Sequence, residues 1–342
     1  MPVDYDIAVV GAGGAGTMAY LRAVLNGDKS VLFSGDSETK RKGRGTWVAE
    51  VDNMPGMHDL KRPITSTTKT TLQWMAKQDE LKDWRHEIKG VVSSVRLIEN
   101  EGDRHFELTY KNKKEEKTVT ASYVINATGI MDIQPYINGS IKPILPFANR
   151  YDVLYCIRCD GHKTIGHKLT LIGNNDSAIY IGSMMKERYD LEEVSILSNG
   201  LEQQFSDTSL ELAEAYGMPL HHSPIVKIRG EAKSSGLEGY ELEDGTVIDS
   251  TVSIVSLGII AYNQLIKEVG ADIDGKGRAL VSARYESSVD GFFVVGDLVS
   301  GHKMQIYTAW DEAVDAADEV NSRLRIAKRN KVLETYRAKK AS

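Results

Sequence analysis

"DYDIAVVGAGGAGTMAYLRAVLNG", residues 4–27, is the stretch that decides the fold class. Its apolar, largely β-branched run at residues 7–10 predicts a strand buried in a parallel sheet. Gly11, Gly13 and Gly16 follow with the spacing G-x-G-x-x-G. In such a turn the first glycine permits the tight bend and the second lets a pyrophosphate approach the backbone. The third lets the next helix pack closely on the strand, with its N-terminus toward the phosphates.

The residues after these glycines complete a strand–helix–strand unit. Apolar residues at 18, 21, 24 and 25 recur at helical spacing, and residues 29–33 predict the second strand. This order predicts a dinucleotide-binding domain, although the glycines alone do not distinguish FAD from NAD. The acidic residue expected on the ribose is displaced, because Ser34 stands at its place and Asp36 follows two residues later.

Two later segments favour FAD. "YVINATGI", residues 123–130, predicts an apolar strand ending in Ala127, Thr128 and Gly129. "VDGFFVVGDLVSG", residues 289–301, predicts another strand, which ends in Gly296 and Asp297. An Asp at a strand end beside a helix N-terminus can bind a polyol chain and cap the helix. Residues 304–324 predict that helix.

The composition limits the classes of function. A chain of 342 residues is long enough for two domains, and 41% hydrophobic with 26% charged residues is typical of a soluble globular protein. A net charge of -6 gives no indication of nucleic-acid binding. No apolar run approaches the ~20 residues that span a bilayer, and the N-terminus lacks the pattern of a signal peptide. We expect a cytoplasmic protein that binds neither membrane nor nucleic acid.

Both cysteines lie in "YCIRCDGH", residues 155–162. In a reducing compartment a Cys-x2-Cys pair is more often redox-active or metal-binding than structural. At a helix start, the helix dipole and Arg158 would favour a reactive thiolate. Zinc is an alternative, because Cys156, Cys159, His162 and His167 form C-x2-C-x2-H-x4-H, although the spacing is shorter than in zinc fingers. An inert core pair is a second alternative.

The whole set of motifs resembles the low-molecular-weight thioredoxin reductases and their flavoprotein relatives. The resemblance covers nearly the whole chain and is carried by "GAGGAG" (11–16), "VDNMPG" (51–56), "ATG" (127–129), "CIRCDG" (156–161), "GNNDSA" (173–178) and "GDLVSGHKMQIYTA" (296–309).

The resemblance implies a homodimeric FAD disulfide oxidoreductase of the α/β class. Its fold would be two Rossmann-like, three-layer nucleotide-binding domains, the second inserted in the first. We expect an FAD-binding domain at residues 1–132 and 257–342, and an inserted NAD(P)H-like domain with the Cys-x2-Cys at residues 133–256. The sequence itself supports the second domain, because "KLTLIG" (168–173) and "EVSIL" (193–197) repeat the strand–helix–strand pattern.

The resemblance also assigns site residues. Cys159 would face the flavin, Cys156 would attack the external disulfide, and Asp160 would carry a proton to or from the thiolate. The residues implied for FAD binding are Gly11, Gly13, Gly16, Asn53, Ala127, Gly129, Gly296, Asp297, Gln305 and Ile306.

The sequence departs from this family at the second nucleotide site, which normally binds NADPH. Asn175 stands where a glycine would let the pyrophosphate approach. Ser198, Asn199 and Gly200 occupy the positions of a basic cluster, and Gln204 stands where a further Arg is expected. Each missing guanidinium removes about 1.5–3 kcal/mol of charge-assisted hydrogen bonding to the 2′-phosphate.

We therefore expect poor NADPH binding and another electron donor. Relatives of this kind take electrons from ferredoxin or another protein, or hold a second flavin at the vacated site. The leading hypothesis is an FAD-dependent oxidoreductase that reduces thioredoxin or another disulfide without NADPH. An orthodox NADPH-dependent thioredoxin reductase and a flavin-binding redox sensor are the alternatives.

Overall fold

The computed structural model describes residues 3–35, 42–100, 103–113 and 115–341, so that Asp36 lies outside the described residues. The chain divides into two compact units. Unit 1 comprises Met1–Val48, Leu60–Met131 and Ala261–Ser342, and unit 2 comprises Ala49–Asp59 and Asp132–Ile260. Residues 49–59, which the sequence interpretation assigned to the first domain, are thus grouped with the second unit. We call them the arm.

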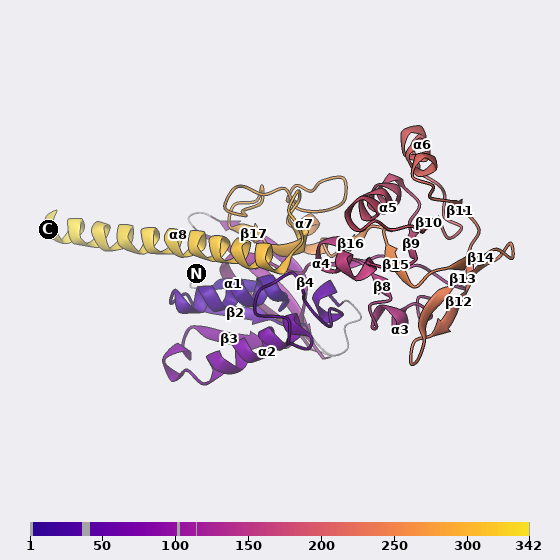
Figure 1. The fold of residues 1–342 in the computed structure, drawn as a ribbon. Helices are drawn as coiled ribbons and strands as arrows, with labels where there is room; N and C mark the ends of the chain where they lie inside the picture. Colours follow the sequence, from indigo (N-terminus) through magenta and orange to yellow (C-terminus); the bar gives the residue numbers. More distant parts are fainter. Residues whose placement is uncertain (1–2, 36–41, 101–102, 114, 342) are drawn as a thin grey trace. The chain divides into compact units, whose positions relative to one another are not determined.

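Unit 1 is built on a seven-stranded sheet with the order β3-β2-β1-β6-β5-β4, in which β17 also pairs with β6 (Figure 1). β1, β2, β3, β6 and β17 are parallel, whereas β4, β5 and β6 pair antiparallel. Parallel strands end at one edge of a sheet, so the loops after β1, β6 and β17 meet there. The elements of this unit are β1 (Tyr5–Val10), α1 (Gly14–Leu25), β2 (Ser30–Phe33), η1 (Arg44–Thr46), α2 (Pro63–Ala76), η2 (Asp79–Leu81), β3 (Arg85–Ile88), β4 (Val91–Asn100), β5 (Asp103–Asn112), β6 (Glu115–Asn126), α7 (Gln264–Glu268), β17 (Phe292–Val294), η4 (Gly296–Leu298) and α8 (Ile306–Ala341).

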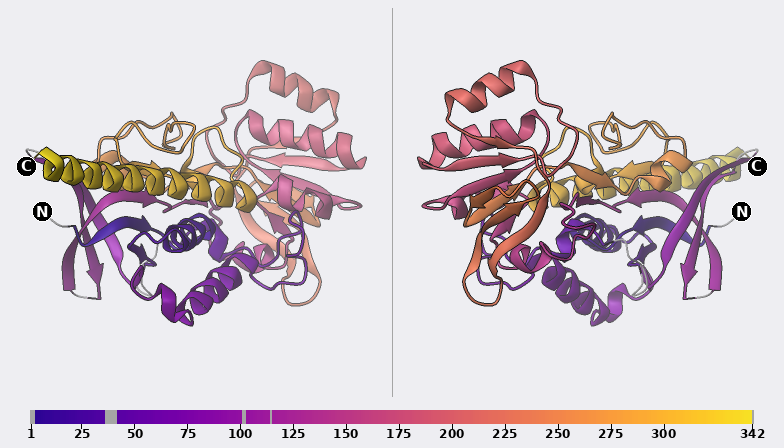
Figure 2. Two further views of the ribbon diagram at one scale, coloured as in Figure 1. Left: turned by 90° about the vertical axis from the view of Figure 1, so that its left-hand side faces the viewer. Right: turned by 90° about the vertical axis from the view of Figure 1, so that its right-hand side faces the viewer.

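Helices α1 and α8 pack side by side on one face of this sheet (Figures 1 and 2). Their contact is made of small side chains, including Ala19 and Ala23 of α1 with Ala313 and Ala316 of α8, all fully buried. The predicted helix at 304–324 begins two residues later and continues to Ala341. From residue 326 to 341 every side chain is exposed.

Unit 2 is built on a fully parallel sheet with the order β11-β10-β9-β15-β8. Helices α5 and α6 cover one face, and the three-stranded sheet β12-β13-β14 with α3 covers the other (Figure 2). The predicted strand–helix–strand repeat is β9–α5–β10. The elements are α3 (Leu145–Ala148), β8 (Val153–Leu154), α4 (Ile157–Asp160), η3 (Gly161–Thr164), β9 (Leu169–Ile172), α5 (Asp176–Tyr189), β10 (Val194–Leu197), α6 (Asp207–Ala215), β11 (Leu220–His221), β12 (Ile225–Glu231), β13 (Gly236–Leu242), β14 (Val247–Asp249) and β15 (Val252–Val255).

The chain passes between the units along β7 (Ile130–Asp132) and β16 (Ile259–Ala261), which pair with each other. The predicted α/β class with parallel sheets is confirmed. Within the described ranges, no helix has both the length and the apolar character needed to cross a membrane.

Candidate redox site and nucleotide-binding turns

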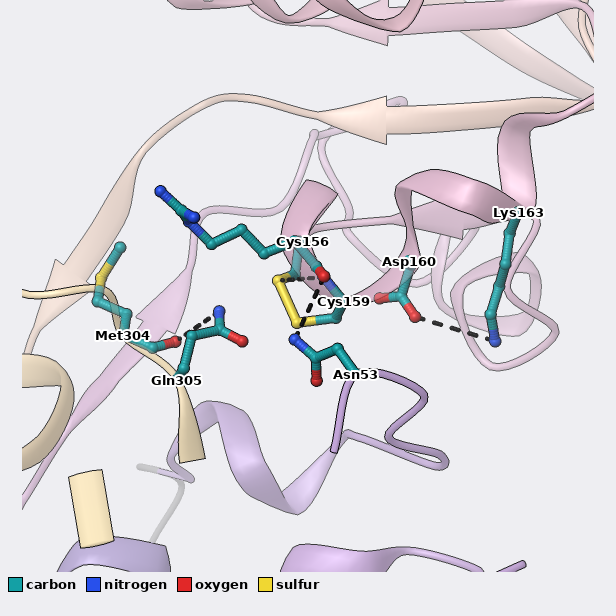
Figure 3. Close-up of a disulfide and its surroundings, with 8 residues drawn as sticks. Asn53, Cys156, Cys159, Asp160, Lys163, Met304 and Gln305 are labelled. Carbon is teal, nitrogen blue, oxygen red and sulfur yellow. Dashed lines mark hydrogen bonds and ion pairs between the residues drawn. A yellow bond between two sulfur atoms is a disulfide. The ribbon is translucent and has the colours of Figure 1, made fainter. Parts of the chain in front are cut away.

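Cys156 and Cys159 form a disulfide in unit 2, with their Cα atoms 5.3 Å apart (Figure 3). Cys156 is the N-cap of the short helix α4, and its Sγ accepts a hydrogen bond from the backbone N–H of Cys159 at 3.2 Å. An N-cap position places a sulfur at the positive end of a helical turn, which stabilises a thiolate there. Both sulfurs are bonded to each other, which favours redox chemistry over the zinc alternative.

Asp160 follows directly, and its side chain is only 15% exposed. Burial raises the pKa of this carboxyl to about 6, although the Lys163 ammonium, 3.9 Å away, opposes the shift. A carboxyl with such a pKa exchanges protons near neutral pH, as general acid–base catalysis requires.

The arm lies against this segment within unit 2 (Figure 3). Asn53 Nδ2 donates a hydrogen bond to the backbone carbonyl of Arg158 at 3.2 Å. Two carboxylates of the arm, Glu50 and Asp52, lie 3.4 and 3.0 Å from Lys163 Nζ. The sequence motifs gave no indication of this cluster, because Lys163 lies outside them.

The first nucleotide-binding turn lies in unit 1, between β1 and α1. Gly11 has a φ of +105°, and a Cβ there would lie 2.5 Å from the carbonyl oxygen of Ala127. A Cβ at Gly16 would overlap the carbonyl oxygen of Gly11, whereas one at Gly13 would meet no atom within 4 Å. The turn is therefore as tight as the motif requires, yet its second glycine borders open space. These residues fit the pyrophosphate of FAD.

The other predicted FAD residues of unit 1 gather around the same turn. Gly296 has a φ of +79°, and a Cβ there would come 2.9 Å from that of Ala15, so η4 packs on the start of α1. A Cβ at Gly14 would overlap the side chain of Ile306, the first residue of α8. Gln305, just before it, is 6% exposed and donates a hydrogen bond to the carbonyl of Met304 at 3.1 Å (Figure 3).

The remaining predicted FAD residues lie in different units. Gly129, with a φ of +71°, and Asp297 of η4 lie in unit 1. Asn53, by contrast, lies in the arm.

A buried carboxylate that the sequence analysis missed supports η4. Glu312 of α8 is 1% exposed, and its Oε2 accepts a hydrogen bond from the N–H of Gly296 at 2.6 Å. Its Oε1 lies 2.7 Å from Nδ1 of His302. The helical spacing could have predicted its burial, because residue 312 lies on the same face of the helix as the buried Ala309 and Ala313.

The second nucleotide-type turn lies in unit 2, between β9 and α5. A Cβ at Gly173 would lie 2.9 Å from that of Ala178, so this turn is also tight. Asn175 is the N-cap of α5, and its Oδ1 accepts a hydrogen bond from the N–H of Ser177 at 3.1 Å. The amide that a phosphate would use is thus already bonded within the chain.

Residues 202–209, which we call the crossing segment, run across the N-terminus of α5. Asn174 bonds with it twice, donating from Nδ2 to Glu202 O at 2.7 Å and accepting from Gln204 N at 2.8 Å. Asp176 Oδ1 accepts from Ser206 N at 2.7 Å and from Ser209 Oγ at 2.6 Å. The hydrogen bond from Ser209 is the main reason that the pKa of Asp176 is lowered. The N-terminus of α5 is therefore bonded to the crossing segment through both Asn174 and Asp176.

The positions expected for a basic cluster have structural roles instead. Asn199 is 9% exposed, has a φ of +53°, donates to Tyr136 O at 2.9 Å and accepts from Ile225 N at 2.8 Å. Ser198 is 1% exposed. A Cβ at Gly200, which has a φ of +72°, would lie 2.8 Å from the Pro224 ring.

Comparisons with known proteins agree with this architecture. The family described as "Pyridine nucleotide-disulphide oxidoreductase" matches residues 5–313. A thioredoxin reductase of Borreliella burgdorferi is 23% identical over 334 residues, 94% of either chain. A mitochondrial dihydrolipoyl dehydrogenase of Canis lupus familiaris is 22% identical over 348 residues; the match covers 92% of this chain but spans only 65% of that relative.

Solved structures share the fold across both units. The crystal structure of HlmI has a TM-score of 0.80 at 19% identity, covering 99% of this chain and 98% of its own. Thioredoxin reductase from Giardia duodenalis has a TM-score of 0.74 at 19% identity, covering 94% and 99%. The chain belongs to the pyridine nucleotide-disulphide oxidoreductase family, as an FAD-dependent enzyme similar to the thioredoxin reductases.

Proposed function

We propose that this protein is a thiol–disulfide oxidoreductase that receives electrons from a donor other than NADPH and passes them through Cys156 and Cys159. The observation that carries the donor proposal is the closure of the second nucleotide turn by the chain itself. Asn175 Oδ1 accepts a hydrogen bond from the backbone N–H of Ser177 in the first turn of α5, and Asp176 holds the crossing segment there. A dinucleotide phosphate would have to displace these bonds and approach a carboxylate.

The substrate in this proposal is a protein or small-molecule disulfide. Thioredoxin is the first candidate, because a relative aligned over 94% of the chain is a thioredoxin reductase. Ferredoxin or another protein reductant is the candidate donor, and a second flavin is a further one. We place the protein, as a homodimer, in a reducing compartment such as the cytoplasm, where a Cys-x2-Cys pair cycles between dithiol and disulfide.

The chain's own residues perform the exchange. The Cys156 thiolate attacks the substrate disulfide and forms a mixed disulfide, and the first substrate thiolate leaves. The Cys159 thiolate then attacks Sγ of Cys156, which closes the internal disulfide and releases the second substrate thiolate. Asp160 gives a proton to a departing thiolate and regains one from water before the next exchange. FAD, when bound, supplies the two electrons that reopen the disulfide.

Anaerobic flavin spectroscopy tests the choice of donor. NADPH and then NADH are added to the oxidised protein, followed by chemically reduced ferredoxin, with reduction of a disulfide substrate as a second readout. We expect the flavin to stay oxidised with either nucleotide and to be reduced by the protein donor, with substrate turnover. Rapid, saturable reduction by micromolar NADPH would instead make this an orthodox reductase.

Cysteine variants test the exchange itself. Cys156→Ser and Cys159→Ser are both expected to retain FAD, because the turns that fit FAD lie in unit 1, and to lose disulfide turnover. Turnover at the wild-type rate in either variant would refute the dithiol mechanism. A reducible flavin without any disulfide turnover in the wild-type protein would favour the redox sensor.

A further inference from the structure

Lys163, the cation paired with Asp160, belongs to a cluster that the Cys-x2-Cys-Asp sequence of the redox site does not explain. Lys163 lies three residues after Asp160, and its side chain is 19% exposed. Its Nζ lies 3.9 Å from Asp160 Oδ1 (Figure 3). It also lies 3.0 Å from Asp52 Oδ2 and 3.4 Å from Glu50 Oε2. We propose that Lys163 is a positioning residue of the redox site, which ties the arm to the Cys-x2-Cys-Asp turn and holds the Asp160 carboxyl for proton transfer. The inference rests on the proposed exchange at Cys156 and Cys159.

The surroundings of Lys163 show that its place is specific. Its Nζ lies 3.8 Å from the ring centroid of Tyr151, so the ammonium has an aromatic face on one side and carboxylates on the other. An ammonium that is largely removed from water needs such partners, because an uncompensated buried charge is costly. A solvated surface lysine would not be held between two segments in this way.

Asp160 is surrounded by groups that both favour and oppose its ionisation. The groups that act on it are Lys163, Asp52, His162 and Glu50, and the two carboxylates oppose its ionisation. His162 Nε2 lies 3.2 Å from Asp52 Oδ2, so this imidazole is directed to the arm. Lys163 is the cation that favours the ionised form most. Burial and the carboxylates of the arm raise the pKa of Asp160, and the Lys163 ammonium lowers it. Removal of the ammonium would therefore raise this pKa further.

The consequence is measurable in the opening of the disulfide by a small dithiol. A dithiothreitol thiolate attacks one sulfur, the Cys156–Cys159 bond breaks, and the departing cysteine thiolate takes a proton from Asp160, which regains one from water. The second dithiothreitol sulfur then closes its ring and releases the other cysteine thiolate. The dithiol is oxidised by two electrons and the protein disulfide is reduced by two.

The test compares Lys163→Gln and Lys163→Arg with the control Lys168→Gln. Lys168 is a half-exposed lysine of the same unit that pairs with Glu193 and Asp249, outside the cluster. The opening rate is measured by alkylation and mass spectrometry between about pH 5 and pH 9, after correction for the thiolate fraction of dithiothreitol. A second readout is the hydrogen exchange of the backbone amides in the arm. Neither readout requires an electron donor or flavin turnover.

We expect a wild-type inflection near the Asp160 pKa of about 6. Lys163→Gln should move it upward by roughly one pH unit and speed exchange in the arm roughly tenfold. Lys163→Arg should restore most of both properties, and Lys168→Gln should resemble the wild type. The proposal is overturned if Lys163→Gln changes neither readout, if Lys168→Gln changes both equally, or if the wild-type profile has no inflection.

In Asp52→Asn the inflection of the pH profile should shift in the opposite direction. This variant also provides the test if Lys163→Gln does not fold. Asp52 raises the pKa of Asp160, so its neutralisation should lower the inflection while still loosening the arm. A shift of the inflection to higher pH in this variant would overturn the proposed electrostatic arrangement. Failure of the NADPH experiment alone would leave these results unaffected, whereas a disulfide that never exchanges would refute the proposed function itself.

Discussion

Asp176 Oδ1 and Ser209 Oγ are joined by a hydrogen bond of 2.6 Å, which ties the crossing segment to the first turn of α5. A carboxylate suits this place, because the helix macrodipole is positive at the N-terminus. The same property attracts phosphate in a dinucleotide-binding turn. In unit 2 the first turn of α5 thus carries an anion of the chain itself, bonded to Ser206 and Ser209.

This arrangement predicts that a glycine at position 175 is not sufficient to create an NADPH site. Asn175→Gly removes the side-chain cap on Ser177 N but leaves both bonds of Asp176 and the crossing segment in place. We expect no NADPH-driven reduction of the flavin in this variant, measured anaerobically against the wild-type protein. A saturable gain of NADPH reduction from this single change would show that the crossing segment is no barrier.

Asn199 should behave as a structural residue. In Asn199→Ala the N–H of Ile225 and the carbonyl of Tyr136 lose their partners, so the free energy of unfolding should fall by about 2 kcal/mol. Denaturant unfolding checks this value. Asn330→Ala, on the exposed part of α8, is the control and should change stability by less than about 0.5 kcal/mol. Equal effects of the two substitutions would contradict the assigned role.

Substitutions at two glycines of the first turn, Gly13 and Gly16, should have different effects. Gly13→Ala places its Cβ in open space, so the fold should remain stable while the FAD content of the purified protein decreases. Gly16→Ala forces its Cβ onto the carbonyl oxygen of Gly11, so the free energy of unfolding itself should fall. The flavin-to-protein absorbance ratio and denaturant unfolding separate these outcomes. Full flavin content in Gly13→Ala would indicate that FAD binds elsewhere.

The pKa of Asp160 makes a signed prediction for stability. Because burial raises this pKa to about 6 from 3.8, the protonated carboxyl is favoured in the folded protein. Stability from this group is fully present below the unfolded pKa and is lost as the pH rises through about 6. Asp160→Asn should therefore gain up to about 3 kcal/mol over the wild type between roughly pH 4 and pH 8. A stability difference that is independent of pH would contradict the raised pKa.

Some of these features follow from sequence, and others depend on contacts between remote residues. Gly11 and Gly16 are predictable because the tight turn and the close helix impose a local requirement on the backbone. Asp176 is not, because its partners Ser206 and Ser209 lie 30 and 33 residues further along the chain. The ion pairs of Lys163 with Glu50 and Asp52 likewise join residues more than 100 positions apart, which no spacing rule encodes.

The start of α8 illustrates a smaller limit of sequence interpretation. Residues 304–324 have a helical pattern, yet the helix begins at Ile306 because Met304 adopts a φ of +53°. The far end extends beyond the prediction, because residues 326–341 bury no side chain and so lack the pattern that marks a packed helix.

The last prediction concerns this exposed end of α8. Removing residues 326–342 should change the free energy of unfolding by less than about 1 kcal/mol, because none of the described side chains there is buried. Removing residues 321–342 should cost about 3 kcal/mol or more, because Asp28 is 1% exposed and would lose Asn321 and Arg325. Arg325 Nη2 lies 2.7 Å from Asp28 Oδ1, and burial already raises the pKa of that carboxyl. Denaturant unfolding of both truncated proteins measures these free energies of unfolding. Similar stability of the two shortened proteins would show that the Arg325–Asp28 pair does not secure α8 to unit 1.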